Sequence, residues 1–293
     1  MKTSMIIDYR KSFALFVIAI LATTNIFAQT QVKNERTREG IDVFLSQKTI
    51  ENTELKRSKL LKNFGFSTSG VMVVATADRF YCIGYNTYVS RKVKGKKISS
   101  FCIIDEDVYF TSESTLYKID TQNREQTVMK LPFSPQSLWA GKKLIYSSYY
   151  KKEGLLYAIS PKEKIKKIIY KTDSPIICVE ELGSLICVLT GKSLTIINIK
   201  DMEYREIPID TKELGTPISM SADETRGIIY FSTNNGSYRI SKGNVQKVCN
   251  ETGQLCYDED GLIIFNSTDP YLIRLQSNLL YGPPTIGVPI EIK

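Results

Sequence analysis

Short apolar runs separated by polar turns recur along this chain with a period of 36 to 41 residues. Each repeat starts with an apolar run, passes through a turn that is often acidic, and continues into a run rich in β-branched and aromatic residues. Runs of this length and composition predict β-strands. One position near the middle of each first strand keeps the same register through the repeats: Cys102, Leu138, Cys178, Ser219 and Cys256. A fixed period of this kind indicates an array of similar structural units.

Three more strands are predicted in most repeats. The second strands are expected at residues 108–111, 144–147, 185–189, 228–232 and 262–266. The third strands are expected at residues 116–119, 156–159, 194–197, 238–240 and 271–273. More polar fourth strands are expected at residues 126–131, 165–170, 204–209 and 244–249. A polar composition suits the outer edge of a sheet, which faces water.

Four-stranded units of about 40 residues predict an all-β fold, a β-propeller, in which the units close into a ring around a central channel. A weaker repeat over residues 64–93 brings the expected number of blades to six, and five to seven fit the pattern. The last repeat has no obvious fourth strand. Residues 41–45, 279–281 and 286–292 are the candidates, the first of which would close the ring with the N-terminal part of the chain.

The third-strand phrase Leu-Tyr-Lys-Ile-Asp at residues 116–120 is echoed as Leu-Tyr-Ala-Ile-Ser at residues 156–160, and five of six repeats carry a version of it. This phrase resembles the repeats of NHL-like and quinoprotein-like propellers. Trp139 is the only tryptophan, so the tryptophan-docking positions of the quinoprotein repeat are missing. The resemblance therefore implies the fold and no particular family.

The first 28 residues are typical of a secretory signal peptide. A basic start that contains Lys2, Arg10 and Lys11 precedes an apolar run at residues 13–22, and Ala28 offers a small residue for cleavage. The alternative is an uncleaved N-terminal anchor, although the apolar run is short for a membrane span. We expect residues 29–63 to form an extension with a short helix at 51–63, and residues 64–293 to form the propeller. The predicted location is the periplasm or the exterior of a Gram-negative bacterium, with no transmembrane anchor after processing.

Composition excludes several kinds of chemistry. The chain has no histidine, which rules out histidine-dependent triads and histidine-ligated metal sites. The formal net charge is +8, yet no basic stripe with stacking aromatic residues appears, so we expect no nucleic-acid binding. We also expect no cofactor, and a binding protein rather than an enzyme.

In such a ring, the turns between first and second strands lie on one face, and the turns between second and third strands lie on the other. The second face combines aromatic, cationic and amide side chains, which suit a protein partner, a carbohydrate or an anionic small ligand. The predicted binding residues are Tyr149, Tyr150, Lys151, Lys152, Lys192, Asn234 and Asn235. The first face carries acidic turns at 105–107, 180–181, 223–224 and 258–260, which fit either local turn chemistry or a site for a cation or basic partner.

The sequence offers two further candidate sites, a cysteine pair and a metal site. Cys178 and Cys187 flank a predicted hairpin and are expected opposite one another, so they form either a disulfide or two buried thiols. The alternative function is that of a metal-dependent, lactonase-like hydrolase, as found on six-bladed rings, whose ion would be held by acid and amide groups. The available ligands for such an ion are Asn234, Asn235, Asn266 and Asp269.

Overall fold

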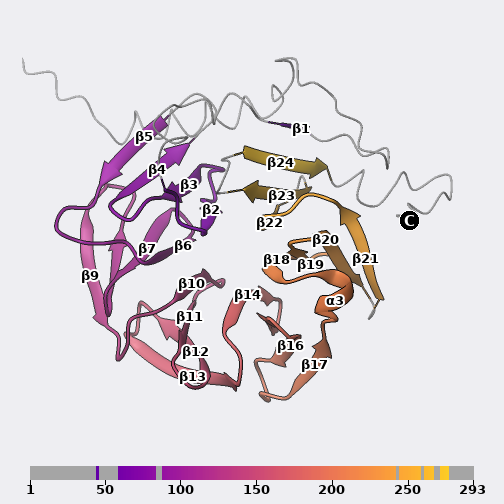
Figure 1. The fold of residues 1–293 in the computed structure, drawn as a ribbon. Helices are drawn as coiled ribbons and strands as arrows, with labels where there is room; N and C mark the ends of the chain where they lie inside the picture. The colour runs from indigo at the N-terminus through magenta and orange to yellow at the C-terminus, as the bar shows by residue number, and fades with distance from the viewer. Residues whose placement is uncertain are drawn as a thin grey trace, which may run out of the picture.

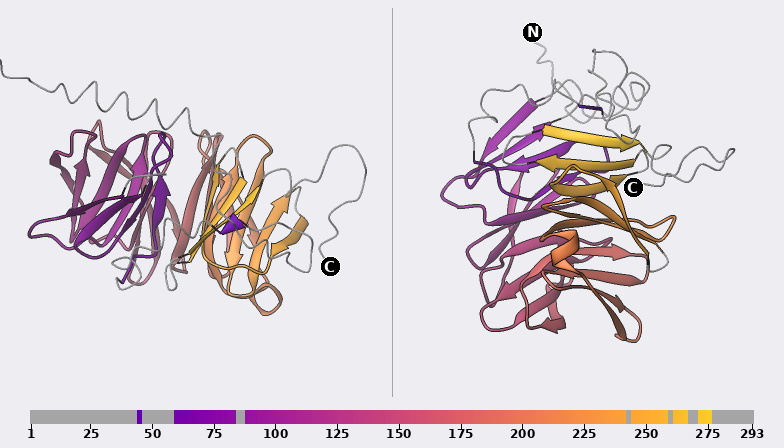
Figure 2. Two further views of the ribbon diagram at one scale, coloured as in Figure 1. Left: turned by 90° about the horizontal axis from the view of Figure 1, so that it is seen from above. Right: turned by 45° about the vertical axis from the view of Figure 1, so that its right-hand side comes forward.

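The protein is described by a computed structural model that covers residues 44–45, 59–83, 88–241, 244–258, 261–266 and 271–276. Four-stranded antiparallel sheets stand radially around a common centre (Figure 1). Seen edge-on, the strands run between the two faces of the ring (Figure 2). The predicted all-β propeller is confirmed.

Five blades consist of four consecutive strands each. Blade 1 contains β2 (Phe64–Phe66), β3 (Met72–Ala75), β4 (Arg79–Ile83) and β5 (Tyr88–Lys92). Blade 2 contains β6 (Ser100–Ile104), β7 (Asp107–Ser112), β8 (Thr115–Ile119) and β9 (Glu125–Lys130). Blade 3 contains β10 (Ser137–Ala140), β11 (Ile145–Tyr150), β12 (Gly154–Ser160) and β13 (Ile165–Thr172). Blade 4 contains β14 (Ile176–Leu182), β15 (Leu185–Thr190), β16 (Ser193–Asn198) and β17 (Tyr204–Pro208). Blade 5 contains β18 (Pro217–Asp223), β19 (Ile228–Thr233), β20 (Gly236–Ser241) and β21 (Asn244–Cys249).

A further sheet, here called the closing sheet, joins the two ends of the described chain. It contains β22 (Gln254–Asp258), β23 (Gly261–Asn266), β24 (Tyr271–Gln276) and β1 (Phe44–Leu45). β1 pairs antiparallel with β24, with Phe44 opposite Arg274. Of the three candidates for the missing fourth strand, the segment at residues 41–45 thus contributes Phe44–Leu45 to the sheet, while residues 41–43, 279–281 and 286–292 lie outside the described residues. On its other side the closing sheet packs on blade 1, because the rings of Phe64 and Phe265 lie with centroids 5.1 Å apart.

Apolar clusters between neighbouring sheets form the core. One cluster combines Cys102 and Leu116 of blade 2 with Leu138 and Ile159 of blade 3, all buried. Another joins Met72 and other residues of blade 1 to Phe265 of the closing sheet. Because each cluster joins two sheets, every blade depends on its neighbours for burial of its apolar faces. Cys102 and Leu138, two of the register positions, meet in the first of these clusters.

Hydrogen bonds one repeat apart join the innermost strands. The hydroxyl oxygen of Ser100 accepts from the backbone N–H of Leu138 at 2.9 Å, and that of Ser219 accepts from the N–H of Leu255 at 3.0 Å. Ser221 accepts in the same way from the N–H of Tyr257 at 2.9 Å. The partners are 38, 36 and 36 residues apart, which is the period of the sequence. Small hydroxyl residues on the first strands therefore satisfy backbone donors of the next sheet.

The prediction of a short helix at residues 51–63 is wrong for the part that the structure describes. Residues 59–63 are not helical, and the N–H of Leu61 instead donates to the carbonyl of Ala75 at 2.7 Å. Leu60 and Leu61 pack on the apolar clusters of blade 1, so their spacing reflects contact with a sheet rather than a helical stripe. Residues 51–58 and the predicted signal peptide, residues 1–28, lie outside the described residues. Within the described ranges, no helix has the length and apolar character needed to cross a bilayer.

Candidate functional site

A pocket of about 610 Å³ opens on the face of the ring that carries the turns between second and third strands, here called the loop face. The innermost strands β10, β14, β18 and β22, which supply many of its walls, converge at the centre of the ring (Figure 1). The lining residues are Lys62, Asn63, Ser137, Trp139, Ile176, Ile177, Thr216, Pro217, Ile218, Asn234, Thr252, Gly253, Gln254, Phe265 and Asn266. They come from blades 1, 3, 4 and 5, the closing sheet and the loops that enter them.

The lining favours a polar ligand that is neutral or negatively charged. Among the described residues, Lys62 is the only charged one in the lining, and none of them contributes a carboxylate. Four amide side chains and three hydroxyl groups provide hydrogen-bonding positions, while Trp139 and Phe265 provide aromatic surface. Eight of the fifteen lining residues are polar, so this wall is more polar than that of a typical small-molecule site and suits a ligand that makes several hydrogen bonds.

Asn234 is held in place by the loop that enters blade 5. Helix α3 (Thr211–Leu214) ends at Gly215, whose φ of 87° lies in the region that favours glycine. A Cβ on Gly215 would lie 2.3 Å from Oδ1 of Asn234, so only glycine allows this close approach. Oδ1 of Asn234 accepts a hydrogen bond from the N–H of Thr216 at 2.7 Å. This bond uses one of the two lone pairs of the oxygen, so the side chain keeps one acceptor position and its amide nitrogen for a ligand.

Two residues just before blade 1 complete the site. The amide nitrogen of Asn63 donates to the carbonyl of Leu138 in blade 3 at 3.3 Å, which leaves its Oδ1 as an acceptor. Lys62 is exposed and forms no ion pair with any residue that the structure describes. Among the described lining residues, its ammonium is therefore the one charge without an ion-pair partner.

The predicted binding residues on blade 3 lie away from the pocket lining. Tyr149 and Tyr150, at the end of β11, are half-buried, and the ring of Tyr149 packs on Phe133 with centroids 5.0 Å apart. Lys151 and Lys152 are exposed in the turn that follows. The tyrosines are thus partly used in packing, while the lysines face solvent on the rim.

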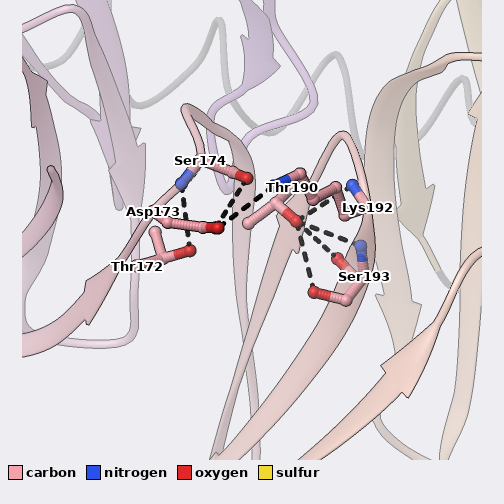
Figure 3. Close-up of polar contacts among 6 residues, drawn as sticks. All are labelled: Thr172, Asp173, Ser174, Thr190, Lys192 and Ser193. Atoms are coloured by element: carbon pink, nitrogen blue, oxygen red, sulfur yellow. Dashed lines mark hydrogen bonds and ion pairs between the residues drawn. The ribbon is translucent and has the colours of Figure 1, made fainter. Parts of the chain in front are cut away.

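Lys192 is engaged with an acid of its own face (Figure 3). Its Nζ lies 3.1 Å from Oδ2 of Asp173, and both side chains are exposed. The hydrogen bond from Lys192 lowers the pKa of Asp173, as does the hydroxyl of Ser174. Thr190 shapes the turn, because its Oγ1 accepts from the N–H groups of Lys192 at 3.2 Å and Ser193 at 3.0 Å. Lys192 is therefore positioned as a partner of Asp173 rather than as part of the pocket.

Of the predicted binding residues, Asn234 lines the pocket and Asn235 does not. Asn266, considered as a metal ligand, lies with Asn234 in the lining, whereas Asp269 is outside the described residues. Hard divalent cations prefer several oxygen ligands that include carboxylates, and the described lining offers only amide and hydroxyl oxygens. No group of three or more potential metal ligands of the His, Cys, Asp or Glu type occurs among the described residues.

The acidic turns of the opposite face hold neighbouring blades together. Glu106 of blade 2 accepts from the hydroxyls of Thr68 at 2.5 Å and Ser69 at 2.9 Å in blade 1. Glu181 of blade 4 accepts from the phenol of Tyr146 in blade 3 at 2.9 Å. Local turn chemistry is found at two other acidic turns, where Oδ1 of Asp223 accepts from the N–H of Arg226 and Oδ1 of Asp258 accepts from the N–H of Gly261, each at 3.1 Å. The acids therefore serve structural bonding, both within turns and between blades.

The expected opposition of Cys178 and Cys187 is wrong. The turn at Gly183 and Ser184 pairs Leu182 with Leu185, and this register places Cys178 opposite Leu189, and Cys187 opposite Glu180. Both sulfurs are free thiols, and both side chains lie in one buried cluster. Burial raises the pKa of each thiol to about 12. These cysteines act as small buried residues.

Thirteen of the fifteen lining residues were not predicted from the sequence, and they include Lys62, Asn63, Trp139, Gln254 and Phe265. A usable signal existed for two of them. Trp139 directly follows the register position Leu138, and Gln254 lies two residues before the register position Cys256, so the starts of the innermost strands mark the pocket. Lys62 and Asn63 carried no such signal, because their segment reads as a helix.

No family model matches this chain, and no curated protein matches it in sequence. Similar solved structures are propellers. A gluconolactonase from Xanthomonas campestris has a TM-score of 0.63 and 10% identity, over 84% of this chain and 93% of that chain. The WD40 domain of Pan2 from Neurospora crassa has a TM-score of 0.57 and 9% identity, over 74% and 75%. A chain of the nidogen/laminin complex has a TM-score of 0.50 and 11% identity, over 71% and 84%. At these identities the likeness shows the fold alone.

Proposed function

We propose that this protein is an exported, non-enzymatic β-propeller that binds a polar ligand on its loop face, in the central pocket. The observation that carries the proposal is the described part of the pocket lining, which combines four amides, three hydroxyls, two aromatic rings and one lysine and includes no carboxylate. Such a lining suits a neutral or anionic carbohydrate-sized molecule, because amides bind hydroxyl groups and an ammonium attracts a carboxylate or phosphate.

The architecture and location belong to the same proposal. In it, the closing sheet acts as a sixth blade, with β1 as its outer strand. Cleavage after Ala28 delivers the ring to the periplasm or the cell exterior of a Gram-negative bacterium. Tyr149, Tyr150, Lys151, Lys152, Lys192 and Asn235 then form the rim around the pocket and contact the larger parts of a ligand or a protein partner.

The alternative is a metal-dependent hydrolase that resembles lactonases. The similarity in fold to the Xanthomonas gluconolactonase favours it, while the donor set of the pocket does not. If an ion binds, Asn234 and Asn266 would hold it, and it would polarise a substrate carbonyl. Isothermal titration with calcium and zinc separates the two functions, because stoichiometric binding is expected only for the hydrolase.

Thermal denaturation with a ligand panel tests the proposal. A ligand that binds only the folded state raises the Tm in proportion to the logarithm of its concentration above the Kd. We expect at least one neutral sugar or sugar carboxylate, such as D-glucose or D-glucuronate, to raise the Tm of the wild type. The Asn234→Ala variant should lose the shift. The control Lys200→Gln, in the exposed turn between β16 and β17 and outside the pocket lining, should keep it. A panel with no shift, or a shift unchanged by Asn234→Ala, would reject the pocket.

A further inference from the structure

Positive charge is concentrated in one blade. Residues 137–172, which form blade 3, contain nine lysines and two glutamates, a formal charge of +7 against +8 for the whole chain. Lys142 is paired with Glu224 at 2.5 Å. None of the other eight lysines of this blade forms an ion pair with a residue described in the structure. The rest of the ring is nearly neutral. The positive electrostatic potential of the protein is therefore concentrated around this blade, where it attracts negatively charged partners.

The outer strand of blade 3 carries much of this charge. β13 has eight residues, whereas the outer strands β5, β9, β17 and β21 have five or six. Lys164 directly precedes it, and Lys166, Lys167 and Lys171 lie within it. The ammonium of Lys166 contacts only a backbone carbonyl, that of Lys130 at 3.3 Å. The positive charge on this strand is therefore not neutralised within the described residues.

Exposed apolar side chains lie next to these lysines along the strand. Ile165 is 58% exposed and Ile168 is 40% exposed. Successive residues of a strand point to opposite faces of the sheet, so Ile165 and Ile168 lie on different faces, each beside a lysine. On the neighbouring blade, Tyr204 is 64% exposed and contacts Tyr170 of β13, with ring centroids 6.0 Å apart. Both faces of this edge thus offer apolar contact flanked by positive charge.

The main-chain groups on the outer side of β13 are open. β13 is the terminal strand of its sheet, and no strand within the described ranges pairs with its outer edge. Lysines on an edge strand discourage pairing with neutral or basic strands, since an unmatched charge would be brought close to a second backbone. The same lysines attract a strand that carries carboxylates, because opposite charges across a strand pair are stabilising.

We propose that the outer edge of blade 3 binds an extended acidic segment of another protein, which adds to the sheet as a fifth strand beside β13. Main-chain hydrogen bonds supply the pairing, Ile165 and Ile168 contact apolar side chains of the added segment, and Lys164, Lys166, Lys167 and Lys171 select its carboxylates. This surface is separate from the central pocket, so the proposal does not depend on what the pocket binds.

The test uses a fluorescein-labelled peptide of twelve residues that alternates glutamate and valine. Fluorescence anisotropy should show saturable binding to the full-length protein that weakens as NaCl is raised, since exposed charges are screened by salt. The combined variant carries Lys164→Gln, Lys166→Gln, Lys167→Gln and Lys171→Gln. It should bind the peptide with an affinity at least about tenfold lower, given the usual strength of exposed ion pairs. The matched control carries Lys94→Gln, Lys97→Gln, Lys200→Gln and Lys212→Gln, which remove the same charge from exposed positions elsewhere, and should bind like the wild type.

Two further probes identify how the edge is used. A peptide with proline in place of alternate valines keeps its carboxylates but lacks N–H donors for pairing, and it should bind much more weakly. Vesicles that contain phosphatidylglycerol should not compete with the acidic peptide. The proposal is overturned if the wild type does not bind the peptide, if the control variant loses as much affinity, if the proline peptide binds equally well, or if the vesicles displace it.

Discussion

The hydroxyl oxygen of Ser219 in blade 5 lies 3.0 Å from the backbone nitrogen of Leu255 in the closing sheet and accepts its hydrogen bond. The same contact joins Ser100 to Leu138 between blades 2 and 3. In a propeller the innermost strands of neighbouring blades do not pair with each other, so their inward backbone groups need other partners. A serine one repeat earlier provides one, and the contact recurs because the repeat recurs.

Replacement of Ser219 by alanine should therefore destabilise the ring. The backbone N–H of Leu255 would be left buried without its acceptor, which costs about 1–3 kcal/mol in the free energy of unfolding. Urea denaturation followed by circular dichroism measures the change. Ser184→Ala serves as the control, because Ser184 is exposed in the turn between β14 and β15. Equal stability of the two variants would show that the inter-blade bond contributes nothing.

The acidic face offers a second test through Tyr146, which is fully buried and donates to Glu181 in the next blade at 2.9 Å. Tyr146→Phe removes the hydroxyl and leaves a carboxylate oxygen with one donor fewer, so we expect a loss of about 1–2 kcal/mol in the free energy of unfolding. Tyr204→Phe is the matched control, since Tyr204 is largely exposed. A loss in the control as large as in Tyr146→Phe would contradict a role for the bond between blades.

Glu180 should make stability depend on pH. Burial raises the pKa of its carboxyl to about 7, against opposing hydrogen bonds from the Ser221 hydroxyl and the Ala222 backbone. Between its ordinary pKa near 4.5 and about 7, the folded protein then binds more protons at this group than the unfolded chain does. The free energy of unfolding contributed by Glu180 therefore falls as pH rises through this window and stays low above it.

The Glu180→Gln variant tests that sign. It should be more stable than the wild type at pH 8, by on the order of 1–3 kcal/mol, and should gain little or nothing at pH 5. Glu163→Gln, at an exposed turn position, controls for the loss of one negative charge. Thermal denaturation at pH 5, 6, 7 and 8 gives the comparison. A wild type that gains stability relative to Glu180→Gln as pH rises would contradict the raised pKa.

Cys178 and Cys187 should be reduced and unreactive in the folded protein. Their pKa values near 12 leave almost no thiolate at pH 8, and both side chains are buried. Iodoacetamide should modify neither cysteine without denaturant and both in 6 M guanidinium without reductant. Peptide mapping by mass spectrometry reads both states. Recovery of a linked pair of peptides that contain Cys178 and Cys187 would show that the bridge forms after all.

The pattern of the sequence was sufficient to predict the blades, because a strand buried on both faces needs an apolar run and a turn at each end. Cys102, Leu138, Cys178, Ser219 and Cys256 indeed occupy equivalent innermost strands. Details that depend on one residue of register were not predictable. Because the turn falls at Gly183 and Ser184, Leu189 rather than Cys187 lies opposite Cys178, and a periodic pattern does not fix the place of a turn to within one residue.

The site was predicted only in part for a similar reason. Asn234 was found because turn amides stand out in a sequence. Lys192 was also selected, yet its partner Asp173 belongs to the loop that precedes blade 4, and their contact depends on how two loops fold together. Lys62 and Asn63 reach the pocket from a segment whose apolar spacing resembles a helix, although tertiary contacts hold it extended.

The central claim is that the loop-face pocket holds a ligand, and Trp139 gives the most direct measurement. It is the only tryptophan of the chain and it lines the pocket. All tryptophan fluorescence of the protein therefore comes from this site. Titration with the ligand that gives the largest Tm shift should change the emission of the wild type saturably, with the change abolished in a variant that combines Lys62→Gln and Asn234→Ala. A ligand that stabilises the protein while leaving Trp139 emission unchanged, or an unchanged titration in the double variant, would contradict the account.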